Sequence, residues 1–288
     1  VDYACRDDFG ARPEDVSAWY GLHYFAARTP SPGAPSAPFL TWPQGNARLI
    51  DHLAQRVGAA RIHLSTVVTG VRAEAGGWRV DTVDMRSGRP QRWTARQVIC
   101  ALPSFLRGHL FSEGVPSYDP TYGAWMVANL HLRGRPRFEG FETAWDNVVH
   151  GSRSLGYVVA THQEGSAYGP TVWTWYLPLV GEDAGAERRR LQQLTWADAA
   201  DVAVSELDGA HADLARHLTR VDLRRWGHAM VRPEPGTAFG AARRAAAQSK
   251  NGLHFAHADL SGVALFEEAF YHGDRAARAA IAARGPRP

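Results

Sequence analysis

Hydrophobic and polar positions follow different periods along the first part of the chain. Apolar residues recur at helical spacing from Leu49 to Val57 and stop at Gly58, so a helix is predicted there. A short helix is also predicted in SAWYGLHYFAAR, and the proline-rich segment TPSPGAPSAPF that follows it is predicted to be a loop. Residues 61–103 predict three or four short strands with glycine turns, and RQVICALP is the last of them.

Strand-like alternation returns after Tyr122 in GAWMVANLHL, LGYVVATHQ and TVWTWYLPLV. A helical period covers residues 187–207, and TRVDLRRWGHAM predicts another strand. Trp173 and Trp175 share one face of their strand, where packing of a sheet onto a helix is favoured over a role in binding. This order of elements predicts an α+β to mixed α/β fold and argues against a simple barrel.

The last part of the chain combines a short apolar strand, an acid and a helix. Residues 253–256 are apolar apart from one histidine, Asp259 follows, and then Ser261 and Gly262 precede a helix that runs to Ile281. The amino end of a helix attracts phosphate or a polarised ring carbonyl, and Asp259 could accept hydrogen bonds from ribose or ribityl hydroxyls. The alternative is that Asp259 or Ser261 only caps the helix.

Composition excludes some classes of function but does not identify one. The chain has 288 residues, of which 45% are hydrophobic and 21% charged, as in an ordinary soluble protein of one large or two interleaved domains. No apolar run is long enough for a membrane span. Net charge is +3 and the basic residues are scattered, so a solvated face is favoured over a nucleic-acid patch. The sequence does not decide the compartment, although the cytoplasm is favoured.

No metal site is predicted. His254 and His257 are three apart, which on a strand places them on opposite faces.

Several segments resemble, in the family's own order, the FAD-binding parts of the flavin amine oxidase superfamily, which includes amine oxidases, protoporphyrinogen oxidases and phytoene desaturases. TWPQGNARLIDHLAQRV resembles the family's glycine turn and helix, with Asn46 in place of the second glycine. IHLSTVVTGVRAEAGGWRV places Val68 at the position whose backbone lies at the adenine. RQVICALP resembles the strand that runs under the FAD. The tail resembles the last FAD-binding segment, although His257-Ala258 replaces the family's glycine.

The resemblance implies an interleaved two-domain, amine-oxidase-like flavoprotein fold. Residues 1–40 and 104–249 would form the substrate domain, while residues 41–103 and 250–288 would belong to the FAD domain. The implied cofactor is FAD, and its contacts would come from Val68, Pro103, Asp259, Ser261, Gly262, Val263, Ala264 and Leu265.

The family's dinucleotide-binding βαβ unit has no counterpart here, because no G-x-G-x-x-G turn follows a strand. We therefore expect this chain to be the C-terminal portion of a larger flavoprotein, with the N-terminal half supplied in cis or as a second chain. We expect the isolated chain to be inactive.

The resemblance also implies a reaction, namely removal of a hydride from a C–N or C–C bond of a small or apolar substrate. Family order places the strand around RRWGHAM near the flavin, so Trp226 and His228 are candidates for a pocket wall, and His228 could handle a proton. A structural histidine is the alternative, and the catalytic residue remains unknown. Many amine oxidases of the superfamily place a lysine beside the reactive flavin nitrogen, whereas Lys250 lies in another segment. A degenerate, non-catalytic binding module and a flavin-dependent isomerase therefore stay open as alternatives.

Overall fold

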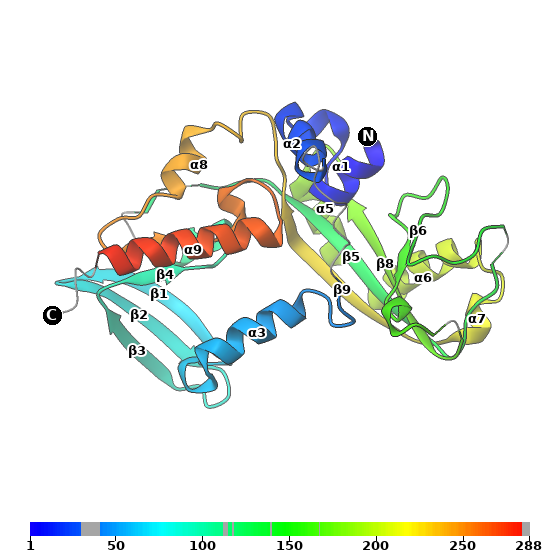
Figure 1. The fold of residues 1–288 in the computed structure, drawn as a ribbon, viewed down its shortest axis with the longest axis horizontal. Coiled ribbons are helices and arrows are strands. Elements are labelled where there is room, and N and C mark those ends of the chain that lie inside the picture. The colour runs from blue at the N-terminus through cyan, green and yellow to red at the C-terminus, as the bar shows by residue number, and fades with distance from the viewer. Residues whose placement is uncertain (30–40, 112–114, 117, 139, 167, 284–288) are drawn as a thin grey trace. The chain divides into compact units, whose positions relative to one another are not determined.

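The computed structural model describes residues 1–29, 41–111, 115–116, 118–138, 140–166 and 168–283, and these form two compact units (Figure 1). Unit 1 comprises Val1–Val16, Gly21–Asp51 and Tyr122–Met230, and unit 2 comprises Ser17–Tyr20, His52–Thr121 and Val231–Pro288. The proline-rich loop predicted over residues 29–39 lies, apart from its first residue, outside the described residues. Both units mix helices and strands, so the predicted mixed α/β class is confirmed.

Unit 1 is built on a five-stranded sheet with the order β6-β7-β8-β5-β9. The strands are β5 (Tyr122–Leu132), β6 (Asp146–Asn147), β7 (Tyr157–Val159), β8 (Thr171–Leu179) and β9 (Leu218–Val231). β8 runs antiparallel to both β5 and β7, with Ala128 opposite Trp175. Helices α1 (Asp2–Phe9), α5 (Ala184–Gln193), α6 (Trp196–Asp208) and α7 (Leu214–His217) lie wholly within this unit.

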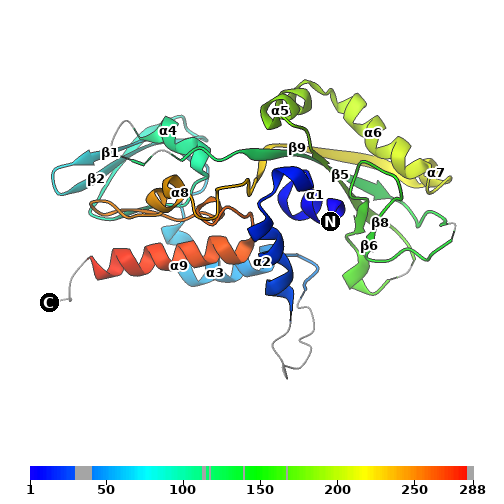
Figure 2. The same cartoon turned by 90° about the horizontal axis from the view of Figure 1, so that it is seen from above.

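One face of this sheet packs onto α5 and α6, as Figure 2 shows. Trp173 and Trp175 are buried in this core beside Leu191 of α5 and Leu207 of α6. The expectation that the two tryptophans pack a sheet onto a helix is confirmed.

The single helix predicted over residues 187–207 is wrong, because the chain forms two helices there. Thr195 interrupts the helical period by acting as the N-cap of α6. Its side chain accepts a hydrogen bond from Asp198 N–H, and the Asp198 side chain accepts one from Thr195 N–H. This reciprocal capping box satisfies two backbone donors that a new helix would otherwise leave unpaired.

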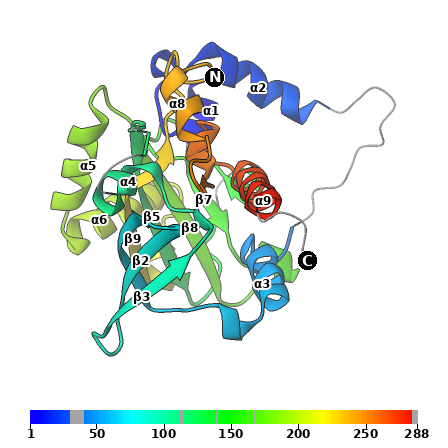
Figure 3. The same cartoon turned by 90° about the vertical axis from the view of Figure 1, so that its left-hand side faces the viewer.

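Unit 2 contains a three-stranded antiparallel sheet and a separate parallel pair. β1 (Thr66–Glu74), β2 (Gly77–Asp84) and β3 (Pro90–Ala95) follow one another as a meander (Figure 1), of which β2 and β3 are also labelled in Figure 3. β4 (Val98–Cys100) pairs in parallel with β10 (Leu253–Phe255). The short strands predicted over residues 61–103 are confirmed. Helices α4 (Arg107–Leu110), α8 (Ala241–Ala246) and α9 (Phe266–Ala282) lie wholly within unit 2.

Two further predicted helices are confirmed as α2 (Ala18–Arg28) and α3 (Ala47–Val57). The helix predicted directly after Gly262 begins later, at Phe266, because the preceding residues form a 3-10 turn (Ala258–Leu260) and an extended approach. Gly262 has φ +79°, a left-handed conformation that cannot continue into a helix.

Candidate functional site

The parallel pair in unit 2 brings together two segments that the sequence predicted to bind a cofactor. Phe255 pairs with Cys100, and Ala256 N–H donates to the Cys100 carbonyl over 2.9 Å. Because the strands are parallel, their carboxyl ends lie at the same edge, where ligands commonly bind in open α/β sheets. We call the edge formed by residues 103–104 and 257–265 the junction edge.

Asp259 joins the two halves of the junction edge. Its Oδ2 accepts a hydrogen bond from Ser104 N–H over 2.8 Å, and its Oδ1 lies 3.1 Å from His257 Nδ1. The residue is only 2% exposed. Asp259 therefore accepts from the first backbone N–H of the turn after Pro103, and it does not cap the following helix α9, whose N-cap residue is Leu265.

Ser104 is a junction residue that the sequence analysis did not identify. It is buried, and within the described part of the chain its hydroxyl has no hydrogen-bond partner. A buried hydroxyl without a partner costs free energy and is uncommon in folded proteins, so it marks Ser104 as an unusual position beside Asp259. Its position directly after Pro103, at the start of a helical turn, is the sequence signal that could have found it.

Gly262 and Tyr20 shape the turn that leads to α9. The Tyr20 hydroxyl donates to the Ser261 carbonyl over 2.8 Å. A Cβ at Gly262 would lie 2.5 Å from the Tyr20 hydroxyl oxygen and 3.0 Å from Thr237 Cγ2. The turn is therefore closed to any side chain at this position, while the adjacent Val263 is buried.

Ser261 is held by a chain of polar groups on α9. Its hydroxyl contacts the Glu268 carboxylate and lies 2.9 Å from His272 Nε2. Arg275 Nε donates to His272 Nδ1 over 3.3 Å, so His272 Nε2 carries the proton that it donates to Ser261. Burial, followed by the nearby Arg275 charge, lowers the pKa of His272 to about 4. His272 is therefore neutral near pH 7 and fixes the rotamer of Ser261.

The amino end of α9 is acidic and lacks a side-chain cap from its N-cap residue. Leu265, its N-cap residue, provides no side-chain hydrogen bond, so the first backbone N–H groups are not capped by it. Glu267 and Glu268 lie in the first turn. Their negative charges stabilise the helix end and disfavour a phosphate there.

Val68 lies in β1, the edge strand of the meander, beside an irregularity in the pairing. It pairs with Thr82, and the register then shifts between Val68 and Gly70. Its side chain packs against the buried cluster that contains Cys100, Phe255 and Leu260. The core of unit 2 thus connects Val68 with both strands of the junction edge, while its predicted contact with adenine stays a prediction.

Trp226 and His228 lie in unit 1 on β9, two residues apart and therefore on one face of the strand. Trp226 is 55% exposed. His228 Nε2 contacts the Arg188 guanidinium of α5, and its ring lies edge-on to Tyr122 at 5.3 Å. These are contacts of a packed histidine, and a role for either residue in a substrate pocket stays a prediction.

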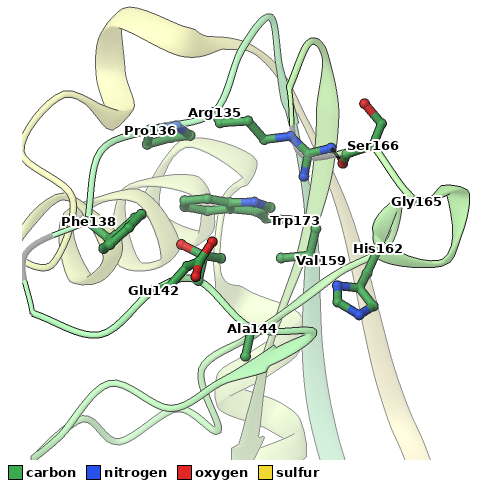
Figure 4. Close-up of a pocket in the computed structure, with 11 residues that line it drawn as sticks. Arg135, Pro136, Phe138, Glu142, Ala144, Val159, His162, Gly165, Ser166 and Trp173 are labelled. Carbon is green, nitrogen blue, oxygen red and sulfur yellow. Dashed lines mark hydrogen bonds between the residues drawn. The ribbon is translucent and has the colours of Figure 1, made fainter.

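Unit 1 also contains a cavity of about 400 Å³ that the sequence analysis did not predict (Figure 4). We call it the loop pocket. Its lining includes Arg135, Pro136, Phe138, Glu142, Val159 and Trp173. A surface loop supplies most of the lining, which is why no periodic pattern in the sequence indicates it.

The described residues form neither a metal-binding cluster nor a membrane-spanning helix. They contain no group of three or more His, Cys, Asp or Glu side chains that could hold a metal ion. None of the helices formed by them has the length and apolar character needed to cross a bilayer.

Comparison with known proteins identifies relatives of the whole chain. The family model described as flavin containing amine oxidoreductase matches residues 16–281. This confirms the resemblance drawn from the sequence segments and the expectation of a flavin cofactor. No curated protein is similar enough in sequence to match the chain.

Solved structures share the fold at low sequence identity. Cyclohexylamine oxidase from Brevibacterium oxydans IH-35A superposes with a TM-score of 0.65 and 16% identity, covering 99% of this chain and 64% of that one. Putrescine oxidase, in its wild-type form bound to putrescine, has a TM-score of 0.60 and 14% identity, covering 83% of this chain and 53% of that one. The predicted amine-oxidase-like fold is confirmed, and the chain spans less than two thirds of the length of these relatives.

Proposed function

We infer the function from the premise that this chain belongs to the flavin-containing amine oxidoreductase family. We propose that it is part of an FAD-dependent oxidoreductase that removes a hydride from a C–N or C–C bond of a small or apolar substrate. The flavin, when bound, supplies the redox chemistry by accepting the hydride. The protein positions the substrate against the flavin and provides an apolar pocket with oriented dipoles. The observation that carries the proposal is the junction edge, where Ser104 and Asp259 meet.

The residues of the junction edge fit a flavin cofactor. The glycine at 262 lets Tyr20 and Thr237 pack closely against the turn and fix its path, and the amino end of α9, which Leu265 does not cap, offers N–H donors. The buried Ser104 hydroxyl and the Asp259 carboxylate provide polar atoms of the kind that bind hydroxyls of a ribityl chain. In this proposal Val68, Pro103, Asp259 and the segment 261–265 contact the cofactor.

One observation favours the non-catalytic alternative. Lys250, the only lysine of the chain, pairs with Leu253 at the amino end of β10, whereas the junction edge lies at the carboxyl end of that strand. The lysine that many amine oxidases place beside the flavin therefore has no equivalent at the junction edge. A binding module that keeps the cofactor without catalysis remains the second candidate.

We predict that Asp259→Asn weakens FAD binding in the full-length protein. Loss of a charged hydrogen-bond acceptor costs about 1.5–3 kcal/mol, which is roughly a tenfold to hundredfold loss of affinity. FAD titration followed by flavin fluorescence measures the effect. Asp274→Asn is the matched control, since Asp274 is an exposed acid of α9 paired with Arg278. Equal FAD affinity of Asp259→Asn and the control would remove Asp259 from the cofactor contacts.

Catalysis is tested separately, by anaerobic mixing of the FAD-loaded protein with a panel of amines and of substrates with oxidisable C–C bonds. Bleaching of the flavin absorbance by a member of either class is the expected result. Turnover that occurs only after photoreduction, with no net oxidation, would instead indicate an isomerase. Retained FAD that no substrate reduces would favour the non-catalytic module.

A further inference from the structure

The loop pocket of unit 1 has the features of a second ligand site, independent of the flavin. Its volume of about 400 Å³ lies within the range of small-molecule sites. In Figure 4 the indole of Trp173 lies between Arg135 and Pro136 on one side and Glu142 on the other, with Phe138 at the edge of the ring. Polar groups of both charges thus surround an apolar centre.

Two buried donors in the pocket lack partners. Trp173 is 1% exposed, and among the described residues neither its Nε1 nor Arg135 Nε has a hydrogen-bond partner. Arg135 is not mobile as a whole, because its Nη2 donates to the Ser166 carbonyl over 2.8 Å and to Thr161 Oγ1 over 3.3 Å. Its unused Nε–H is therefore held in a fixed direction.

The Trp173 ring is held equally firmly by two neighbours. Tyr157 stacks on it with the ring centroids 4.3 Å apart, and the His211 ring lies 4.8 Å away. His211 is itself anchored, since its Nδ1 lies 2.9 Å from the Arg137 carbonyl and its Nε2 lies 2.8 Å from the Tyr157 hydroxyl. An indole N–H fixed in this way is a preorganised donor, which lowers the entropy cost of binding an acceptor.

Charge and shape select the class of ligand. Two N–H donors, one of them on a guanidinium, suit a carboxylate. The exposed carboxylate of Glu142 on the same lining disfavours a simple anion and favours a ligand that also carries a positive charge. Pro136, Phe138 and Val159 supply apolar walls for the body of the ligand.

We propose that the loop pocket binds a small zwitterion with the chemistry of a free amino acid. Its carboxylate accepts hydrogen bonds from Arg135 Nε and Trp173 Nε1, its ammonium group pairs with Glu142, and its apolar side chain rests against Phe138 and Pro136. No chemical step is involved. Binding here would make the protein responsive to the concentration of an amino acid, whatever its flavin chemistry.

The test uses three probes that share one skeleton. L-phenylalanine carries both charged groups, 3-phenylpropanoate lacks the ammonium group, and 2-phenylethylamine lacks the carboxylate. Each is titrated into the flavin-free 288-residue chain labelled with ¹⁵N-tryptophan, and the Trp173 Nε1–H resonance is assigned by its loss in Trp173→Phe. This local signal separates the loop pocket from any binding of an amine near a flavin.

L-phenylalanine is expected to shift the Trp173 resonance at concentrations about tenfold below those needed for either partial probe. Glu142→Gln, a change on the exposed loop, is expected to weaken L-phenylalanine about tenfold and to leave 3-phenylpropanoate unaffected or improved. Glu164→Gln, an exposed acid outside the lining, is the matched control and should change nothing.

Three outcomes would overturn the proposal. In the first, no probe moves the Trp173 resonance, and the pocket holds only water. In the second, 2-phenylethylamine binds as tightly as L-phenylalanine, so the two donors do not recognise a carboxylate. In the third, Glu142→Gln leaves the preference for L-phenylalanine intact. None of these outcomes affects the flavin proposal, because FAD plays no part in the measurement.

Discussion

At the residue scale, Gly262 is the position where a single methyl group should be most harmful. Its φ of +79° strains any L-residue, and a Cβ would lie 2.5 Å from the Tyr20 hydroxyl oxygen. We predict that Gly262→Ala lowers the free energy of unfolding by about 1–3 kcal/mol, measured by urea denaturation.

Gly273 provides the matched control for this prediction. It lies in the middle of α9, and apart from its chain neighbours and the backbone of its own helix no atom lies within 4 Å of where its Cβ would stand. Gly273→Ala should therefore stabilise the protein by up to about 1 kcal/mol through helix propensity. The interpretation of the turn would be wrong if both alanine variants had the same stability.

His272 should make the stability of the protein depend on pH. Its pKa is lowered to about 4 by burial, against about 6.5 in an unfolded chain. Between these values the unfolded state binds a proton that the folded state does not bind. The free energy of unfolding should therefore fall as pH drops from 6.5 to 4, by about 3 kcal/mol in total.

The variant His272→Gln isolates this contribution, because glutamine has an amide donor and does not titrate. We expect the difference in unfolding free energy between the protein and His272→Gln to change across this pH window and to stay constant above it. Denaturant unfolding at several pH values between 4 and 7.5 measures the difference. Parallel pH profiles of the two proteins would contradict the assignment of a buried neutral His272.

Residues with a local signal could be identified from the sequence, and residues defined by tertiary contacts could not. Asp259 and Gly262 follow an apolar strand and precede a helix, so their place in a turn was visible. Tyr20 has no such signal, because its partner Ser261 lies 241 residues away. The position of Ser104 after Pro103 indicates a turn, but its contact with Asp259, 155 residues away, could not be read from the sequence. The loop pocket could not be predicted for the same reason, because its two buried donors come from a loop and from a strand distant in sequence.

At the scale of elements, the break between α5 and α6 depends on one side chain. Thr195 caps α6 through the reciprocal bonds with Asp198. We predict that Thr195→Ala costs about 1 kcal/mol of stability, while Thr195→Ser retains most of it because the hydroxyl remains. Thermal unfolding of the three proteins tests this. A Thr195→Ser variant as unstable as Thr195→Ala would show that the methyl group, and not the cap, is responsible.

The same break shows why the helical period was misread. Apolar residues continue at helical spacing from α5 into α6, since both helices pack on one sheet core. The spacing of apolar residues indicates which face of a helix is buried. It does not indicate where one helix ends and another begins when both bury their apolar faces in the same core. The capping pattern, a threonine followed three residues later by an acid, was present and is the more local signal.

At the scale of the whole molecule, exposed apolar side chains recur along one helix. On α3, Ile50, Leu53 and Val57 are 52%, 40% and 47% exposed and lie at helical spacing. Contiguous apolar surface of this kind acts as an association site. We predict that the 288-residue chain self-associates and binds FAD weakly by itself, as measured by light scattering combined with flavin fluorescence.

Leu53→Gln should reduce this self-association, whereas Gln55→Glu, a polar change on the same helix, should have little effect. The family resemblance implies a dinucleotide-binding unit that would hold the pyrophosphate, and the acidic first turn of α9 is unsuited to that role. A monodisperse monomer that retains stoichiometric FAD would contradict this prediction.

The parallel pairing of β4 with β10 also determines when unit 2 can fold. Its core contains residues from both strands, and the contact between Ser104 and Asp259 spans 155 residues. Such a high contact order slows folding, because a long loop must close before the contacts that stabilise it exist. During synthesis the meander β1–β3 can pair within itself, but its packing into the core of unit 2 must wait until β10 has left the ribosome. The apolar faces of these early strands are open to chaperones throughout that interval.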